Sequence, residues 1–571
     1  GNSFLGQGSG ISITTGVRNS GYGTKSLASL TTGNDNVANG YNSLNTITTQ
    51  SNNVAVGSGA LQYNTVSGNT AVGYLSLNSN TTGTNNNAVG SFALSTNTTG
   101  ISNIGIGSFA LNANTTGSYN IGIGTNALQL NTVGGNNIAI GEFAMSMNTT
   151  GTGNVAVGVV ALTSNVTGNF NTATGFFALE SSITSDNSAY GYSALVSSTT
   201  GTNNNAFGSR ALSNNLTGSF NCAFGDGALQ NSSGGRNIAI GSDVLAFTTG
   251  SNNIGVGFNS LLINATGNNN IAIGSNTLSL NGNGSDNVAT GYESMLSNLS
   301  GSGNTAVGAF TLFTNQTGGS NVAIGRSALS ANQTGNSNVA IGTVALISSV
   351  SASHNTAVGH QSLLNTTGAE NVALGAFSAV SNTSGVNNVA VGYRALLRNT
   401  TGSNNVAIGT NSAPNLTTES GNIVISNNNA LGVVGQNNHT YIDNIFGVTT
   451  VSGGALTVLV DSNGCLGTVS SSRRFKRDIK SIQSDEILHS KLMSLNPVSF
   501  IFNEDKDNTL QFGLIAEEVN EIMPEIVVLY SGKKGDKPIP HTVRYDQLVP
   551  LLLNEVIRLS KELDSLKAKL Q

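Results

Sequence analysis

The chain has 571 residues, of which 9% are charged, 72 are Gly, 6 are Pro and none is Trp. A typical soluble protein carries about 25% charged residues, so the composition argues against ordinary enzyme domains, and the scarcity of Pro argues against collagen. The formal net charge of -5 gives no electrostatic reason to expect nucleic acid as a partner. No apolar run reaches the ~18 residues of a membrane span, so no membrane insertion is expected.

The first 420 residues repeat one pattern, which reads N-N-[VI]-A-[VI]-G-x-x-A-L-x-x-N-T-T-G-x. The Gly that closes the apolar run recurs 25 times between Gly6 and Gly409, in steps of 17 residues with five steps of 16. A fixed short period over this length predicts a β-solenoid. Because stacked strands lie ~4.8 Å apart, 25 coils predict a shaft on the order of 120 Å long.

Each repeat is expected to form one coil of two short strands and two turns. In Asn338-Val339-Ala340-Ile341-Gly342, alternation predicts that Val339 and Ile341 point into the coil and that Ala340 points outward. A second strand is expected at Ala-Leu pairs such as Ala328-Leu329. The N-T-T-G stretch is typical of a turn, because Asn and Gly tolerate positive φ.

One coil encloses little, so a single chain would leave a strip of Ala, Gly and Val exposed along the whole shaft. Such a strip favours association, and a parallel bundle of identical chains is the natural solution. Asn ladders between coils are expected to add hydrogen bonds. The repeat resembles the head repeats of trimeric autotransporter adhesins and the shafts of phage and viral fibres. This resemblance implies a homotrimeric β-roll over residues 1–425.

The charged residues concentrate in the C-terminal part, because residues 471–571 hold 30 of the 49 charges. This break predicts a transition segment at 426–470 and a separate domain at 471–571. Strands are expected at 422–425, just before the transition segment, and at 455–460, within it. The fold class is therefore mainly β, with a small α/β domain after the shaft.

The segment 461–479 resembles the start of the intramolecular chaperone domain of endosialidases and other phage tail fibres, whose core pattern is S-D-x-R-x-K. Ser471, Arg474 and Lys476 match this pattern, and Ser472 stands in place of the usual acidic residue. The segments 512–519 with 523–525, and 545–552, resemble the second and third motifs of the same family. The family's domain is a self-cleaving peptidase, also found in membrane-tethered transcription factors.

The resemblance implies cleavage between Ser470 and Ser471, with the Ser471 hydroxyl as nucleophile, Lys476 as its base and Arg474 in support. A Lys can act as base for a Ser hydroxyl only in its neutral form, which nearby positive charges and burial favour. The alternative is a basic turn with no chemistry.

The final segment, about 546–571, has the 3–4 spacing of a heptad seam. A parallel trimeric coiled coil is expected, and a helix packed on its own domain is the alternative. The seam consists of Val549, Leu552, Val556, Leu559, Leu563, Leu566 and Leu570.

These features predict a homotrimeric fibre or adhesin shaft on a virion or cell surface, assembled by a C-terminal chaperone that then releases itself. A bacterial surface or secreted filament is the alternative. A polysaccharide-degrading tailspike ranks lowest, because the acidic residues of the repeats are few and scattered.

A host glycan or protein receptor is the expected partner besides the chain itself. No cofactor or metal is expected, because the five His lack metal-ligand spacing. The aromatic residues that follow the anchor Gly are expected to pack between coils or chains, and stacking on glycans is the alternative.

Overall fold

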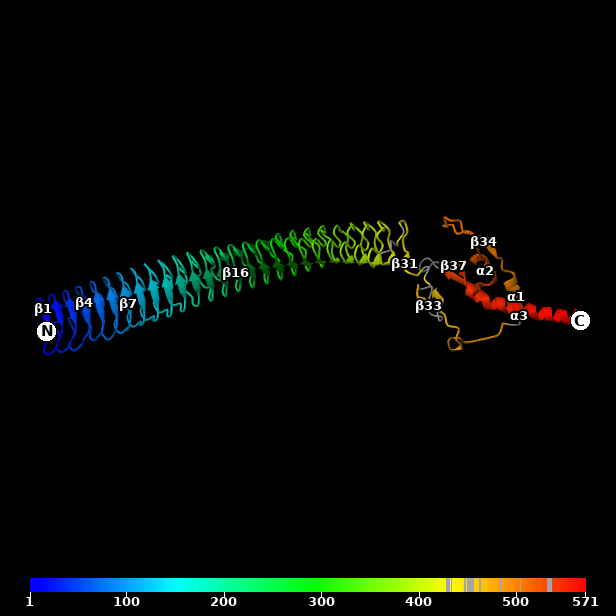
Figure 1. The fold of residues 1–571 in the computed structure, drawn as a ribbon. Helices are drawn as coiled ribbons and strands as arrows, with labels where there is room; N and C mark the ends of the chain where they lie inside the picture. Colours follow the sequence, from blue (N-terminus) through cyan, green and yellow to red (C-terminus); the bar gives the residue numbers. More distant parts are fainter. Residues whose placement is uncertain are drawn as a thin grey trace. The chain divides into compact units, whose positions relative to one another are not determined.

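A computed structural model of the chain divides into two compact units, Gly1–Phe446 and Gly447–Gln571. The structure describes residues 1–427, 432, 434–445, 448, 456–461, 464–482, 485–503, 505–530 and 537–570. The first unit is a β-solenoid, so the predicted mainly β repeat structure is confirmed (Figure 1).

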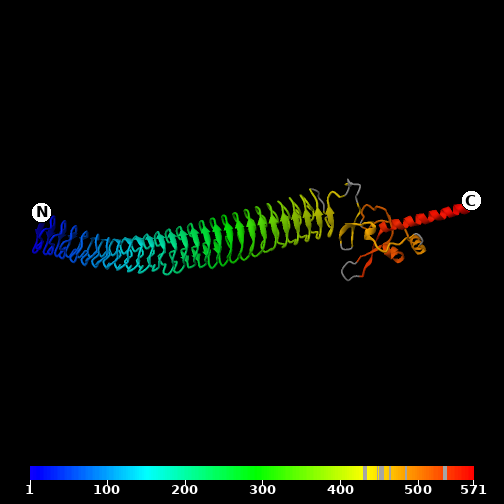
Figure 2. The ribbon, with the colours of Figure 1, turned by 90° about the horizontal axis from the view of Figure 1, so that it is seen from below.

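The solenoid is built on one parallel sheet of 27 strands, which we call sheet A; each strand has three residues and belongs to one coil (Figure 2). Its first half comprises β1 Ser3–Leu5, β2 Ser20–Tyr22, β3 Val37–Asn39, β4 Val54–Val56, β5 Thr70–Val72, β6 Asn87–Val89, β7 Ile104–Ile106, β8 Ile121–Ile123, β9 Ile138–Ile140, β10 Val155–Val157, β11 Thr172–Thr174, β12 Ser188–Tyr190, β13 Asn205–Phe207 and β14 Cys222–Phe224. Its second half comprises β16 Ile238–Ile240, β18 Ile254–Val256, β20 Ile271–Ile273, β22 Val288–Thr290, β23 Thr305–Val307, β24 Val322–Ile324, β25 Val339–Ile341, β26 Thr356–Val358, β27 Val372–Leu374, β28 Val389–Val391, β29 Val406–Ile408, β30 Ile423–Ile425 and β31 Thr440–Ile442.

The sequence period fixes the register of sheet A, because each residue pairs with its equivalent in the next coil. In β24 and β25, Val322 pairs with Val339 and Ile324 with Ile341. The anchor Gly that follows each strand has φ near +130°; at Gly90, a Cβ atom would lie 2.4 Å from the carbonyl oxygen of Gly107. Only Gly combines this backbone conformation with so close an approach between coils.

The predicted direction of the strand side chains was wrong. Ala340, at the centre of β25, is fully buried, whereas Val339 and Ile341 are half-exposed, and Ile341 keeps 36% of its surface accessible. The interior is narrow at the strand centre, where every sheet A strand from β2 to β29 carries Ala or Gly; a branched residue, Val424, is buried there in β30, near the end of the solenoid. A Cβ built on Gly105, at the same place in β7, would already lie 3.2 Å from Cγ of Leu94. The half-exposed Val and Ile side chains therefore form an apolar face on the outside of most of sheet A, interrupted at β11, whose outer residues are Thr172 and Thr174.

The strand predicted at the Ala-Leu pair is also wrong, because the pair lies in a tight turn; even in the four coils that have a second strand, that strand begins two residues after the Leu. Leu329 has φ of 52° and is fully buried, and its N–H donates to the carbonyl of Ala345 at 2.9 Å. A left-handed residue costs about 1–2 kcal/mol, whereas burying a Leu side chain stabilises by about 1.5–3 kcal/mol. Burial therefore outweighs the backbone strain. The N-T-T-G glycines, which were expected at positive φ, do not adopt it; Gly100 is an example.

Four coils do form a second parallel sheet, which we call sheet B. It consists of β15 Asn231–Ser232, β17 Phe247–Thr248, β19 Ile263–Asn264 and β21 Leu280–Asn281. In each strand the second residue is buried in the core and the first lies outside it, as Thr248 and Phe247 show with exposures of 2% and 51%. The outer residues of sheets A and B thus lie on different faces of the solenoid.

The expected Asn ladder runs inside the solenoid from Asn19 to Asn422. One buried Asn stands just before each strand of sheet A from β2 to β30. The backbone N–H of Asn103 donates to Oδ1 of Asn86 at 2.9 Å, and the Asn86 amide donates to the carbonyl of Gly100 at 2.8 Å. The same contacts recur from coil to coil, for example between Asn137 and Asn120. Each side chain thus satisfies polar groups of two turns that water does not reach.

The solenoid continues past residue 425, where the sequence analysis ended the shaft, since β31 still pairs with β30.

Near this end of the solenoid, Glu419 takes the place of the turn Gly and is 4% exposed. Its carboxylate accepts the N–H groups of Thr417, Thr418 and Gly435 at 2.6, 3.1 and 2.8 Å. Burial raises the pKa of Glu419, but these N–H groups outweigh it and lower the pKa to about 2.

The second unit is α/β and ends in the predicted helix, which begins at Tyr545 rather than 546. Of the strand expected at 455–460, Val458–Val460 is formed and Ala455 lies outside the described residues. The elements are β32 Val458–Val460, β33 Leu466–Thr468, η1 Arg473–Phe475, α1 Glu486–Met493, β34 Val498–Phe500, β35 Gln511–Gly513, α2 Ala516–Ile522, η2 Pro524–Ile526, β36 Val527–Tyr530, β37 Ile539–Val543 and α3 Tyr545–Leu570.

Replacing Asn86 by Ala should destabilise the solenoid by about 2–4 kcal/mol, because the Asn103 N–H and the Gly100 carbonyl lose their buried partner. Its neighbour Asn87 is exposed at the start of β6, and Asn87→Ala is the matched control, expected to change stability by less than about 0.5 kcal/mol. Denaturant unfolding measures both. Equal effects of the two substitutions would contradict the structural role of the ladder.

The Glu419 carboxylate should make the end of the solenoid sensitive to acid. Because its folded pKa of about 2 lies below the ordinary 4.5, its stabilisation is present above pH 4.5 and is lost as the pH falls towards 2. The loss should reach at most about 3 kcal/mol and appear as faster amide exchange at residues 417–435. Glu419→Gln should remove this pH dependence while keeping the turn, because Gln50 accepts the equivalent N–H groups of Thr48 and Thr49.

Candidate functional site

The predicted cleavage segment lies around one turn of 3-10 helix. Ser472 precedes η1, and its N–H donates to Oγ of Ser470 at 3.2 Å. The N–H of Lys476 donates to the carbonyl of Arg473 at 3.1 Å and closes the turn. The three predicted catalytic residues therefore lie on one turn: Ser471 comes before it, Arg474 is in it and Lys476 ends it.

This turn is exposed, and its predicted catalytic groups are not assembled. Residues 464–481 are all exposed, and within this stretch no hydrogen bond joins Ser471 to Lys476. The guanidinium of Arg474 lies 4.8 Å from the ring centre of Phe475, a cation–π contact within the turn. Ser462 and Asn463 of the predicted first motif lie outside the described residues. A single chain thus presents the Ser470–Ser471 peptide, the predicted cleavage site, to solvent and leaves the predicted base Lys476 exposed.

The second and third motifs meet in the structure, although they are separated in the sequence. The Leu514 N–H donates to Oη of Tyr545 at 2.8 Å. A Cβ on Gly513 would lie 2.7 Å from the same Oη, so only Gly leaves room for this contact. A small core lies beneath it and contains Val519, Met523, Ile526, Val527 and Val543, with Leu548 and Leu551 of α3 packed against it. These motifs build the domain and position the start of α3.

A buried ionic cluster joins α3 to α1, and the sequence analysis missed it. Glu555 is 4% exposed, and its carboxylate contacts Nδ1 of His489 at 2.8 Å and Nε of Arg558 at 3.0 Å. Burial raises the pKa of Glu555, but the hydrogen bonds from Arg558 and His489 outweigh it and lower the pKa. Leu548, Leu551 and Glu555 follow helical spacing, so one face of α3 is held by its own domain.

The neighbouring face of α3 carries the predicted heptad seam, each of whose first three residues follows a domain-facing residue by one position, and it has no partner within the described part of the chain. Its side chains are 52–87% exposed. The seam comprises Val549, Leu552, Val556, Leu559, Leu563, Leu566 and Leu570. The first turns of α3 thus pack on their own domain, as the second alternative from the sequence expected, whereas the trimeric coiled coil through the exposed seam stays a prediction.

A cavity of about 330 Å³ lies between β34, α2 and β37, beside the contact between Leu514 and Tyr545. Its lining is mainly apolar and includes Phe500, Ile515 and Val543. Glu517, His541 and Tyr545 add polar groups.

In the described residues, no cluster of His, Cys, Asp or Glu could hold a metal ion. No helix there is both long and apolar enough to cross a membrane.

A family model described as the chaperone of endosialidase matches residues 471–528. The match begins at Ser471, the predicted nucleophile, and covers the second motif, while the third motif at 545–552 lies beyond it. No curated protein and no solved structure matches the chain. The endosialidase chaperone domain is therefore supported at the C-terminus of a β-solenoid, an arrangement that fits a fibre-like protein.

Proposed function

We propose that the protein is a homotrimeric fibre or adhesin shaft for attachment to a host or surface. In this proposal the C-terminal domain associates three chains, aligns their solenoids and then releases itself by cleavage before Ser471. The observation that carries it is the match to the endosialidase chaperone at 471–528, which follows in the chain a solenoid with half-exposed Val and Ile on most strands of sheet A. A virion or an extracellular surface is the proposed location.

Two apolar surfaces support association. The outer face of sheet A presents half-exposed Val and Ile on most of its strands, and a long apolar row of this kind is typical of an association surface. The α3 seam presents a second apolar row. Identical coils can pair in many shifted alignments, whereas a heptad seam together with a folded domain defines one. Association of the C-terminal domains before the shafts would therefore set the register.

The proposed cleavage is an attack by Oγ of Ser471 on the carbonyl carbon of Ser470. The new C–O bond replaces the C–N bond between the two residues, and the amine of Ser471 takes the proton that Lys476 removed from the hydroxyl. Water then hydrolyses the ester and frees residues 471–571. Because Lys476 is exposed in one chain, burial on association would favour the neutral Lys that the reaction needs.

The trimer should depend on the α3 seam. Static light scattering of the Ser471→Ala chain, which is expected to stay uncut, should give three times the chain mass. In that background Leu559→Asp should abolish the trimer, because it buries a charge at the seam. Ser565→Asp adds the same single negative charge to α3 at an exposed position away from the seam, and is the matched control that should remain trimeric. A monomeric Ser471→Ala chain, or a trimeric Leu559→Asp variant, would contradict the proposal.

Cleavage should require the Ser471 hydroxyl and Lys476. Ser471→Ala and Lys476→Ala should each slow cutting by at least about 100-fold, seen by intact mass spectrometry as retained full-length chain. Ser472→Ala is the matched neighbour and should be cut like wild type. If Ser472→Ala blocks cutting and Ser471→Ala does not, the nucleophile is assigned one residue too early. A wild-type chain that stays intact after trimer formation would refute the cleavage.

A further inference from the structure

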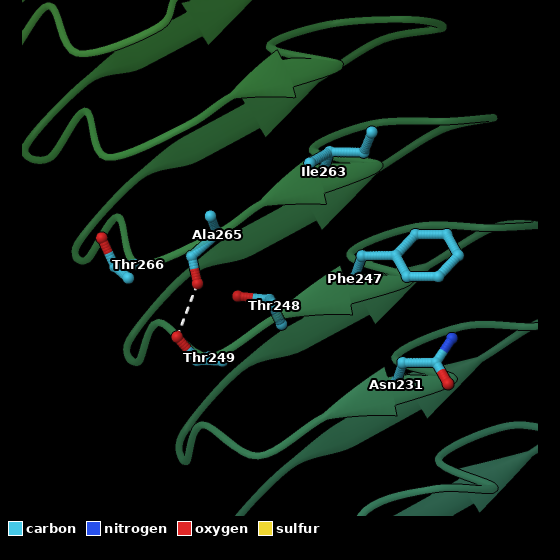
Figure 3. A pocket seen from close by; sticks show the side chains of 7 residues that line it. All are labelled: Asn231, Phe247, Thr248, Thr249, Ile263, Ala265 and Thr266. Atoms are coloured by element: carbon cyan, nitrogen blue, oxygen red, sulfur yellow. Dashed lines mark hydrogen bonds between the residues drawn. The ribbon is translucent and has the colours of Figure 1, made fainter.

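The shaft departs from its regular form where sheet B is present, and two grooves lie in those coils. The first, of about 360 Å³, is lined by sheet B and the turn after it (Figure 3). The second, of about 300 Å³, is lined by the turns at 217–220, 233–236 and 251. Asn231 and Thr249 of the first groove lie two residues from Ser233 and Ser251 of the second. The two linings are thus adjacent on shared coils.

The first groove combines an apolar row with a row of hydroxyl groups. Asn231, Phe247 and Ile263 follow one another on successive coils, and Thr249 and Thr266 lie beyond them (Figure 3). Phe247 is 51% exposed and Ile263 is 41% exposed. The Thr249 hydroxyl donates to the carbonyl of Ala265 at 2.6 Å, so its oxygen is held in place as an acceptor.

The second groove presents an aromatic ring with a guanidinium beside it. Phe220 is 57% exposed, and Cζ of Arg236, on the next coil, lies 5.9 Å from its ring centre. Among the described residues, no carboxylate forms a salt bridge with Arg236, in contrast to Arg210, which lies 3.4 Å from Asp226. Ser233 and Ser251 complete the polar lining.

This surface would remain open in the proposed trimer. The inner residues of sheet B meet the sheet A side inside the solenoid, because Asn253, just before β18, and Asn264 of β19 both donate to the carbonyl of Gly267. The outer residues of sheet B therefore lie on a different face of the solenoid from the apolar face of sheet A. Chains that associate through sheet A would therefore leave both grooves accessible on each copy. A repeated ligand could then engage several copies, which raises the effective affinity.

We propose that these two grooves form one binding site for a carboxylated oligosaccharide. The inference rests on the proposed attachment role and names its ligand class. Sugar rings present apolar C–H faces edged by hydroxyls, and they require apolar platforms directly beside hydrogen-bonding groups. Phe247, Ile263 and Phe220 supply the platforms, and the Thr and Ser hydroxyls supply the polar partners. Arg236 supplies paired donors suited to a carboxylate.

Other ligand classes fit the surface less well. A peptide that adds a strand needs a free sheet edge, but β17 is paired on both sides, with β15 and β19, and the groove lies on the face of the sheet. A lipid surface needs a larger uninterrupted apolar patch, whereas the Thr and Ser residues divide this one.

The test uses the full-length protein, with its mass first checked by light scattering, on an array of neutral and carboxylated oligosaccharides, together with a peptide array and anionic lipid vesicles. Affinities for the bound oligosaccharide then follow by calorimetry. Phe247→Ala should weaken binding about ten-fold or more. Arg236→Gln should weaken binding of the carboxylated form by a similar factor and leave its neutral analogue unchanged. Raised salt should weaken only the carboxylated form.

Matched controls lie elsewhere on the shaft. Phe143 is 40% exposed on another coil, and Arg394 lies 5.0 Å from the Tyr393 ring, so Phe143→Ala and Arg394→Gln should bind like wild type. A trimer that binds no oligosaccharide, or binds one equally with Phe247→Ala, would overturn the site while leaving the fibre proposal intact. Peptide or vesicle binding lost in Phe247→Ala, or carboxylate binding unaffected by Arg236→Gln, would also overturn it. A monomeric protein would instead contradict the proposed fibre.

Discussion

The buried Asn ladder is the interaction on which the solenoid depends. Coils of 16 or 17 residues enclose a core that is mostly Ala and Leu, too thin to hide polar backbone groups by bulk alone. Each ladder Asn accepts the next Asn N–H and donates to a turn carbonyl, as Asn86 does with Asn103 and Gly100. A buried polar group without a hydrogen-bond partner lowers the stability of the fold by about 1–3 kcal/mol. The ladder therefore holds strand and turn in place in every coil, and the anchor Gly permits the close stacking it needs.

The sequence predicted the period, the stacking and the ladder, because all three follow from repetition. It did not predict which strand face is inside. Alternation of Val339, Ala340 and Ile341 is compatible with either choice, and hydrophobicity alone favours the larger residues inside. The thin interior reverses that choice, as the 3.2 Å approach of a Cβ on Gly105 to Leu94 shows. Likewise, nothing local marks Leu329 as left-handed, since its burial against neighbouring coils decides the matter.

In the C-terminal unit, motif resemblance found Ser471, Arg474 and Lys476, and the heptad spacing found the α3 seam. The Glu555 cluster was not found, because His489 lies 66 residues away and no local pattern joins the two. Glu419 was missed for a related reason, since its role depends on Gly435 of the following coil. Short-range patterns thus identified candidate chemistry, while the contacts that hold it in place depend on chain folding.

The two faces of α3 suggest an order of assembly. Leu548, Leu551 and Glu555 fix the start of the helix on its own domain, using contacts within one chain. The seam is then presented by a helix that is already oriented, so association need not also pay for helix formation. The solenoid offers a weaker internal reference, because its outer Val and Ile recur on most coils and a shift by one coil changes little over much of its length. A register chosen at the seam would be transmitted down the shaft, and cutting before Ser471 would remove the reference once the stacked coils hold the alignment themselves.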